Sequence, residues 1–392
     1  MLQLVMIVFD RFFNPIEESA KRSFFLFGPR QTGKTFLLNR LFPKVPYYNL
    51  LLSDVFFQLS QRPMRIREEI LAYRARGTVS QPIVIDEVQK LPLLLDEVQY
   101  LIDTLGFHFI LTGSSARKLK LGGANLLAGR ARTHLLFPLV TNEIPDFDLN
   151  RALNYGTLPS IYQSDEPWQD LSAYCGTYLQ EEIQSEGAVR RIQNFSRFLE
   201  TAALSNGELL NFENVARDCA VPPRTVREYF YILEDTLVGT MVRPFRKVQK
   251  RKTISSAKFY FFDVGVANVL AKRREVLPKT ENYGKVLEHF VFTELRAYLA
   301  YTNDERELTF FRTTSGREVD FVVGDEMAVE VKAGANITER ELQCLQVLGE
   351  EIPLRHKIIA STDRTPRRIR DIEILPVLTF LERLWAGEYS VG

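Results

Sequence analysis

This sequence of 392 residues contains few cysteines, and it has neither an excess of one charge nor a long apolar run. The three cysteines, Cys175, Cys219 and Cys344, have neither the CxxC spacing of a zinc site nor the density of a disulfide-rich secreted domain. A reducing cytoplasm is therefore the expected location. Lys and Arg number 50 against 49 Asp and Glu, so the net charge of +1 excludes a global field that would attract nucleic acid or membrane.

Segments that would span a membrane are also missing. No stretch approaches the ~18 apolar residues of a membrane helix. The apolar start, residues 1–9, lacks a basic leader and a cleavage site, so we interpret it as mature protein, with Met6 as an alternative start. Apolar residues make up 45% and charged residues 25%, as in ordinary globular proteins. The length predicts two or three domains at ~150 residues each.

Three regions differ in pattern. Residues 1–141 alternate helical stretches with short apolar runs at 24–27, 47–50, 83–85, 109–111 and 135–137, which is typical of a parallel sheet covered on both faces. Residues 142–280 are mostly helical, and residues 281–392 begin with a long helix and continue as a mixed sheet. The predicted fold class is α/β: a parallel-sheet domain, a helical module and a small α/β domain.

A phosphate-binding loop is the strongest motif. Residues 28–35 fit G-x-x-x-x-G-K-[ST] between an apolar strand and a helical run. Backbone N–H groups of such a loop turn inward around phosphates, Lys34 reaches the β and γ phosphates, and the Thr35 hydroxyl binds Mg²⁺. The predicted nucleotide-binding residues are Gly28, Pro29, Arg30, Gln31, Thr32, Gly33, Lys34 and Thr35.

Two further strand ends fit ATP hydrolysis. Asp86 and Glu87 end the apolar run at 83–85, where Asp86 is placed to hold Mg²⁺ and Glu87 to polarise the attacking water. Ser114 follows the run at 109–111 and is our first candidate for a residue that senses the γ phosphate; a helix cap is the alternative. We therefore expect an ATP hydrolase that uses Mg²⁺.

A basic cluster follows, and Arg130 within it is our candidate for the arginine that stabilises transition-state charge, from the same or a neighbouring subunit. A solvated basic surface is the alternative.

Together these motifs carry a family resemblance. Residues 28–35, 85–92, 111–119, 127–130 and 137–143 resemble the prokaryotic AAA-type ATPases whose C-terminal half is a domain of unknown function. The resemblance implies an AAA-type core with sheet order 5-1-4-3-2, then a winged-helix segment and a restriction-endonuclease-like domain. It also implies homo-oligomers.

The middle of the chain contains a predicted helix–turn–helix at 212–219 and 224–236. Arg224 and Arg227 lie on the exposed N-terminal half of the second helix, where a recognition helix meets bases. Residues 243–258 are basic and contain no acid, so they would attract phosphates as a wing. DNA is therefore a candidate partner, and a lid or subunit contact is the alternative. The expected wing contacts are Lys247, Lys250, Arg251 and Lys252.

A nuclease-like set is predicted near the C-terminus. Glu330 and Lys332 are two apart on a strand and share a face, Asp320 lies on the neighbouring strand, and Glu288 lies on a helix. These acids could hold a divalent metal ion, with Lys332 orienting or activating water. The set resembles the PD-(D/E)XK nucleases, although no proline precedes Asp320. A nuclease fold without metal chemistry is the alternative.

The leading hypothesis is an ATPase that acts on or near DNA through its winged helix and nuclease-like domain. The alternative is an ATP-switched signalling or scaffold protein whose C-terminal half recruits a protein partner without cleaving DNA. A third hypothesis is a transcription regulator that binds DNA sequence-specifically through Arg227.

Overall fold

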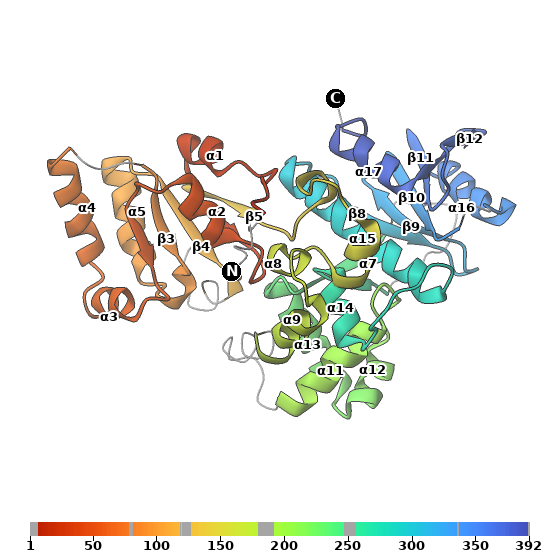
Figure 1. Ribbon diagram of the computed structural model, residues 1–392, viewed down its shortest axis with the longest axis horizontal. Helices are drawn as coiled ribbons and strands as arrows, with labels where there is room; N and C mark the ends of the chain where they lie inside the picture. The colour runs from red at the N-terminus through yellow and green to blue at the C-terminus, as the bar shows by residue number, and fades with distance from the viewer. Residues whose placement is uncertain are drawn as a thin grey trace. The chain divides into compact units, whose positions relative to one another are not determined.

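The computed structural model describes residues 7–77, 81–117, 119, 127–178, 192–246, 256–334 and 337–390. The chain divides into two compact units, drawn in Figure 1. The first contains Arg11–Pro138 and Asp235–Leu237, and the second contains Met1–Asp10, Leu139–Glu234 and Val238–Gly392. No helix within the described ranges has the length and apolar character needed to cross a membrane.

A parallel sheet forms the centre of the first unit. Its described strands lie in the order β2-β3-β4-β1-β5, which confirms the order 5-1-4-3-2 expected from the resemblance. Every residue of β1, β3 and β4 is buried, as in sheets covered on both faces. The strands are β1 (Ser23–Phe27), β2 (Tyr47–Asn49), β3 (Ile83–Asp86), β4 (Phe109–Gly113) and β5 (Ala131–Leu135).

Helices cover this sheet. Because strand side chains alternate, Phe25, Ile85 and Leu111 share one core with side chains of α4 and α5, among them Ile70 and Leu101. The helices of the unit are α1 (Pro15–Lys21), α2 (Lys34–Leu41), α3 (Ser53–Gln61), α4 (Arg65–Ala75) and α5 (Leu94–Leu105), with a short turn of 3₁₀ helix, η1 (Val88–Lys90). The carboxyl ends of β1, β3 and β4 meet at one edge of the sheet, so the loops that follow them can form a single site.

One predicted strand is displaced. The apolar run at 135–137 was expected to form the strand, but β5 spans Ala131–Leu135 and pairs with β1. As an edge strand it keeps Arg132 and Thr133 exposed, so its sequence does not show the continuous apolar run of a central strand.

The second unit begins with helices. Their shared core contains Leu171, Phe198, Phe230 and Ala267, with Phe259 from a strand. The predicted helix–turn–helix corresponds to α12 and α13, and the side chain of Asn211 caps α12 by accepting from the N–H groups of Glu213 and Asn214. The helices are α7 (Leu149–Tyr155), α8 (Pro159–Tyr162), α9 (Pro167–Ala173), α11 (Ile192–Leu204), α12 (Phe212–Cys219), α13 (Pro223–Asp235) and α14 (Val264–Leu270), after η2 (Thr141–Glu143).

A mixed sheet joins the rest of this unit. Its described strands lie in the order β12-β13-β11-β10-β9-β8-β6-β7. Strand β6 pairs in parallel with β8 and antiparallel with β7, so residues predicted as two domains, 142–280 and 281–392, share one sheet and one compact unit. The strands are β6 (Gly239–Pro244), β7 (Lys258–Phe261), β8 (Leu308–Arg312), β9 (Glu318–Val323), β10 (Met327–Lys332), β11 (His356–Ser361), β12 (Arg367–Ile369) and β13 (Ile372–Pro376).

The long helix expected near residue 285 is α15 (Glu281–Tyr301), followed later by α16 (Glu339–Gly349) and α17 (Val377–Trp385). Glu294 of α15 is buried and accepts from the Trp385 indole Nε1 at 2.6 Å and from the backbone N–H of Thr141 at 2.8 Å. This carboxylate therefore joins α15 to α17 and to η2.

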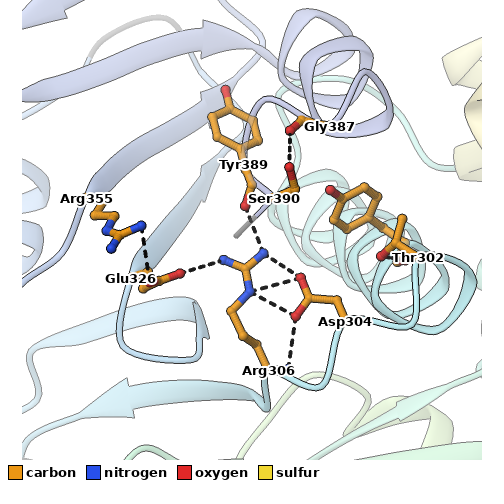
Figure 2. A network of polar contacts seen from close by, with 9 residues as sticks. Thr302, Asp304, Arg306, Glu326, Arg355, Gly387, Tyr389 and Ser390 are labelled. Carbon is orange, nitrogen blue, oxygen red and sulfur yellow. Dashed lines mark hydrogen bonds and ion pairs between the residues drawn. The ribbon is translucent and has the colours of Figure 1, made fainter. Parts of the chain in front are cut away.

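An ion network closes the C-terminal end of the unit (Figure 2). Arg306 donates to both carboxylate oxygens of Asp304 and, at 2.8 Å, to the backbone carbonyl of Tyr389. It also contacts Glu326, which Arg355 approaches from solvent at 3.5 Å. One guanidinium thus connects the segment before β8, the turn between β9 and β10, and the chain after α17.

Candidate functional site

The predicted phosphate loop closes around Lys34. The ammonium of this buried lysine donates to the carbonyls of Gly28 at 2.6 Å and Pro29 at 3.0 Å, and the Thr32 hydroxyl donates to the Pro29 carbonyl at 2.9 Å. A Cβ added at Gly28 would lie 2.3 Å from the carbonyl oxygen of Leu136, so only glycine fits there. The loop therefore has the curled backbone that a phosphate chain requires.

Arg11 braces this loop and was missed in the sequence. Its guanidinium donates to the carbonyls of Thr32 at 2.7 Å and Phe137 at 2.6 Å. It precedes the first strand and belongs to no motif, so no pattern in the sequence indicates its role.

Asp86 meets Thr35 at the edge of the sheet. The Thr35 hydroxyl donates to Asp86 Oδ2 at 2.8 Å, Tyr47 donates to the same oxygen at 2.8 Å, and Thr112 donates to Oδ1. Burial, followed by the charge of Asp86, raises the pKa of Tyr47 far above its usual range, so Tyr47 stays a donor. Tyr47 was also missed, although the strand order places β2 beside β3 and would have indicated it.

Lys34, Thr35 and Asp86 fit a Mg²⁺–nucleotide. Hydroxyl and carboxylate oxygens are the ligands that Mg²⁺ prefers, and a lysine ammonium in a curled loop is a partner for phosphate oxygens. When bound, Mg²⁺ would neutralise phosphate charge, and Thr35 and Asp86 are the residues that would hold it.

Glu87 and Ser114 also lie at this edge, linked by Gln89. Gln89 donates to Glu87 Oε2 at 2.5 Å and to the buried Ser114 hydroxyl at 3.4 Å. Glu87 has a left-handed backbone, with φ of 62°, which turns its carboxylate off the end of β3. The two predicted residues therefore belong to one hydrogen-bonded chain, and Gln89 is a further polar group that sequence motifs did not single out.

Arg130 lies at the opposite edge of the sheet. It directly precedes β5, whose Ala131 pairs with Ser23 at the start of β1, whereas the phosphate loop follows the end of β1. The start of β1, beside Arg130, and the end of β1, where the phosphate loop begins, are five residues of strand apart, which is about 16 Å. Arg130 donates to Asp103 at 2.6 Å. The structure thus does not bring Arg130 to the phosphate loop of its own chain.

The two arginines of the predicted recognition helix are exposed. Arg224 of α13 is 91% exposed at its side chain and pairs with Glu228 at 3.3 Å, and Arg227 lies 5.1 Å from the ring centroid of Phe212. Lys247, Lys250, Arg251 and Lys252 lie outside the described residues.

The nuclease-like residues on β9 and β10 come together. The backbone N–H of Asp320 donates to Glu330 Oε2 at 3.3 Å, and Asp320 Oδ2 accepts from the N–H of Val331 at 2.8 Å. Lys332 pairs with Glu330 at 2.7 Å. Burial, followed by the charges of Glu330 and Glu288, raises the pKa of Asp320 well above its usual range.

Glu288 of α15 is bound to a lysine. Lys258 contacts Glu288 at 2.9 Å and Glu318 at 2.7 Å, and Tyr260 donates to Glu288 Oε1 at 2.5 Å. The expectation that Lys258 belongs to an exposed basic wing is wrong, because it is buried in β7 with acids on both sides. Only the pairing of β7 within the larger sheet reveals these partners.

These C-terminal residues do not fit a divalent ion in the observed arrangement. Within the described ranges, no three His, Cys, Asp or Glu side chains are grouped as metal ligands. One candidate ligand, Glu288, already contacts the Lys258 ammonium, which also contacts Glu318.

Family comparisons cover the chain in three parts. Residues 20–145 match a family described as an AAA domain. Residues 146–276 match a domain of unknown function (DUF8612), and residues 283–380 match another (DUF4143). With the phosphate-loop geometry, the first match supports an AAA-type P-loop ATPase domain in the N-terminal part of the chain.

The relatives that match by sequence are distant. An uncharacterized protein of Methanocaldococcus jannaschii is 23% identical, with 88% of this chain and 84% of the relative covered. An uncharacterized protein of Haemophilus influenzae is 24% identical, with 65% and 70% covered. Among solved structures, Aeropyrum pernix ORC1 in complex with DNA is 15% identical with a TM-score of 0.23, covering 64% of this chain and 87% of that one. A STAND protein of Pyrococcus horikoshii is 14% identical with a TM-score of 0.24, covering 78% and 49%.

Proposed function

We propose that this protein is a Mg²⁺-dependent ATP hydrolase of the AAA type. The observation that carries the proposal is the contact of Thr35 with Asp86 at 2.8 Å, beside a loop closed around Lys34. Lys34 binds and orients phosphate oxygens, while Thr35 and Asp86 hold the metal ion. Glu87 accepts the proton of the attacking water, and Gln89 fixes its carboxylate relative to Ser114.

ATP turnover by the full chain tests this proposal. We expect Mg²⁺-dependent phosphate release that Lys34→Ala abolishes, because the loop then loses its only ammonium. Lys44→Ala, at an exposed lysine just beyond the same helix, is the matched control and keeps wild-type turnover. Equal turnover in Lys34→Ala and wild type would exclude hydrolysis at this loop.

We propose further that α12, α13 and the β6–β7 pair act as a winged helix that contacts DNA. The exposure of Arg224 and Arg227 at the start of α13 supports this, because a recognition helix presents its N-terminal residues to the groove.

Salt-dependent DNA binding tests this second part. Arg227→Ala should weaken binding and, if Arg227 contacts a phosphate, reduce the salt slope by about one. Arg217→Ala removes an arginine of α12 that is 76% exposed and serves as the control. Equal binding by wild type and both variants would leave α13 without a DNA role.

A second candidate function is an ATP-switched scaffold whose C-terminal half recruits a partner without cleaving DNA. The ion pair of Lys258 with Glu288 favours it, because it occupies a carboxylate that cleavage would need. DNA cleavage at Glu288, Asp320, Glu330 and Lys332 stays a prediction. The observation that would support this prediction is DNA cleavage with Mg²⁺ or Mn²⁺ that Asp320→Ala abolishes.

A further inference from the structure

A polar cavity of about 380 Å³ lies beside the carboxylates of the second unit. Its walls come from the loop after α11, from β7, from α15 and from β8 and β9. The charged residues that line it are Glu208, Lys258, Lys285, Glu288, Arg312 and Glu318. The pocket is therefore polar on several sides, and its cations and anions already face each other.

Lys258 is the most buried of the charged side chains that line this pocket. Its side chain is 4% exposed, and its ammonium contacts Glu288 Oε1 at 2.9 Å and Glu318 Oε1 at 2.7 Å. The ring centroid of Phe310 is 5.4 Å from the same nitrogen. A buried ammonium with two carboxylates and an aromatic face is held as a fixed charge rather than as a mobile surface group.

The surrounding charges nearly balance. Four carboxylates, those of Glu288, Glu318, Asp320 and Glu330, lie with the three cations Lys258, Arg312 and Lys332. Burial alone would lower the pKa of Lys258, but the charge of Glu288 and those of its other acidic neighbours raise it well above its usual range. Burial, followed by the charges of Glu330 and Glu288, raises the pKa of Asp320 and so favours its neutral form. The negative charge of the carboxylates is thus balanced by cations of the protein itself.

We propose that Lys258 is the resident cation of this carboxylate cluster and that its ammonium excludes a divalent metal ion from Glu288 and Glu318. A metal ion needs carboxylate oxygens at 2.0–2.6 Å, about where the ammonium now stands among the same oxygens. The two cations are therefore mutually exclusive occupants. The inference does not depend on ATP hydrolysis, since it concerns residues of the second unit alone.

Binding of Mn²⁺ to the full chain without nucleotide tests the proposal. Wild type and Glu288→Gln should bind the same amount of Mn²⁺, because no Mn²⁺ site in wild type depends on Glu288. Lys258→Met keeps an apolar stem of similar length and removes the ammonium, so it should gain about one Mn²⁺ per chain at the carboxylates. The double variant Lys258→Met/Glu288→Gln should lose that gain, which assigns it to this cluster.

Lys285→Met is the matched control. Lys285 lines the same cavity but pairs with Glu208 at 2.8 Å and Glu281 at 3.0 Å instead, so its loss should create no Mn²⁺ site. If Lys258→Met fails to fold, Lys258→Gln, which also lacks the ammonium and keeps both carboxylates, is judged by the same gain.

Two results would overturn the proposal. One is a wild-type Mn²⁺ site that depends on Glu288, and the other is a folded Lys258→Met, or Lys258→Gln, that gains no Mn²⁺. ATP turnover is measured on the same preparations. Its absence in wild type would remove the ATPase proposal and leave the result for Lys258 unaffected.

Discussion

Several side chains of this protein owe their chemistry to burial. Lys34 is buried, Asp86 has no exposed surface, and both are held by hydrogen bonds from their own unit. Under the proposed function, both groups are oriented before nucleotide binds, so little of the free energy of binding is lost to ordering them.

The pH dependence of stability should show the effect of one buried histidine. Burial lowers the pKa of His289 to about 4, and its Nε2–H donates to the Phe261 carbonyl at 2.7 Å. The unfolded state binds this proton near pH 6.5 and the folded state does not, so the free energy of unfolding falls as pH drops from 6.5 to 4. The loss from this residue reaches about 3 kcal/mol.

Urea unfolding at pH 7 and pH 4.5 measures this contribution. His289→Gln retains a donor without a titrating ring, so the variant should lose less stability than wild type on acidification. An identical acid-induced loss in both proteins would contradict the assignment.

Arg306 is the second residue whose environment sets its importance (Figure 2). Its side chain is 11% exposed and contacts Asp304, Glu326 and the Tyr389 carbonyl. Arg306→Met should lower the free energy of unfolding by about 1.5–3 kcal/mol, because two partly buried carboxylates lose charge-assisted hydrogen bonds. Arg355→Ala is the control: Arg355 is 66% exposed and contacts the same Glu326, so we expect a loss within about 1 kcal/mol. Equal losses in thermal or urea unfolding would refute this difference.

At the scale of elements, α15 connects the C-terminal unit because successive turns carry different contacts. Glu288 faces Lys258, His289 faces β7, and Glu294 reaches α17. Its N-terminus is capped by the Thr280 side chain, which accepts from the N–H of Tyr283. A single helix therefore holds together the charged cluster and the terminal helix.

A glycine near the start of α15 offers a stabilising change. A Cβ added at Gly284 would meet Ala333 Cβ at 3.6 Å, an ordinary contact. Gly284→Ala should raise the free energy of unfolding by about 0.5–1 kcal/mol, because alanine loses less backbone freedom in a helix. The opposite is expected for Gly265→Ala in α14, where the Cβ would lie 2.1 Å from the Tyr155 carbonyl oxygen. Urea unfolding of both variants checks the sign, and destabilisation by Gly284→Ala would contradict it.

At the scale of the whole molecule, the placement of Arg130 bears on assembly. Because it lies at the amino edge of the sheet, it can serve a phosphate loop only in another copy of the chain. We expect Arg130→Ala and Lys34→Ala each to abolish ATP turnover, and a mixture of the two to recover part of it, since mixed oligomers contain one intact composite site. Full activity of Arg130→Ala, or no recovery in the mixture, would show that Arg130 is not that residue.

The sequence by itself determined the parts that depend on local chemistry. The glycine spacing of residues 28–35 and the acids at the end of β3 predict a nucleotide site without tertiary information, because phosphate binding uses the backbone of one short loop. Buried parallel strands were predictable from continuous apolar runs. The edge strand β5 was not, since exposure on one side removes that signal.

Only the tertiary structure decided which distant residues meet. Lys258 looks in the sequence like one cation of a basic wing, yet strand pairing through β6 and β8 brings it to Glu288 and Glu318. Arg11 and Tyr47 likewise gain their roles from contacts across the sheet edge. Such partners are set by which strands lie side by side, and this order depends on packing between segments rather than on any local pattern.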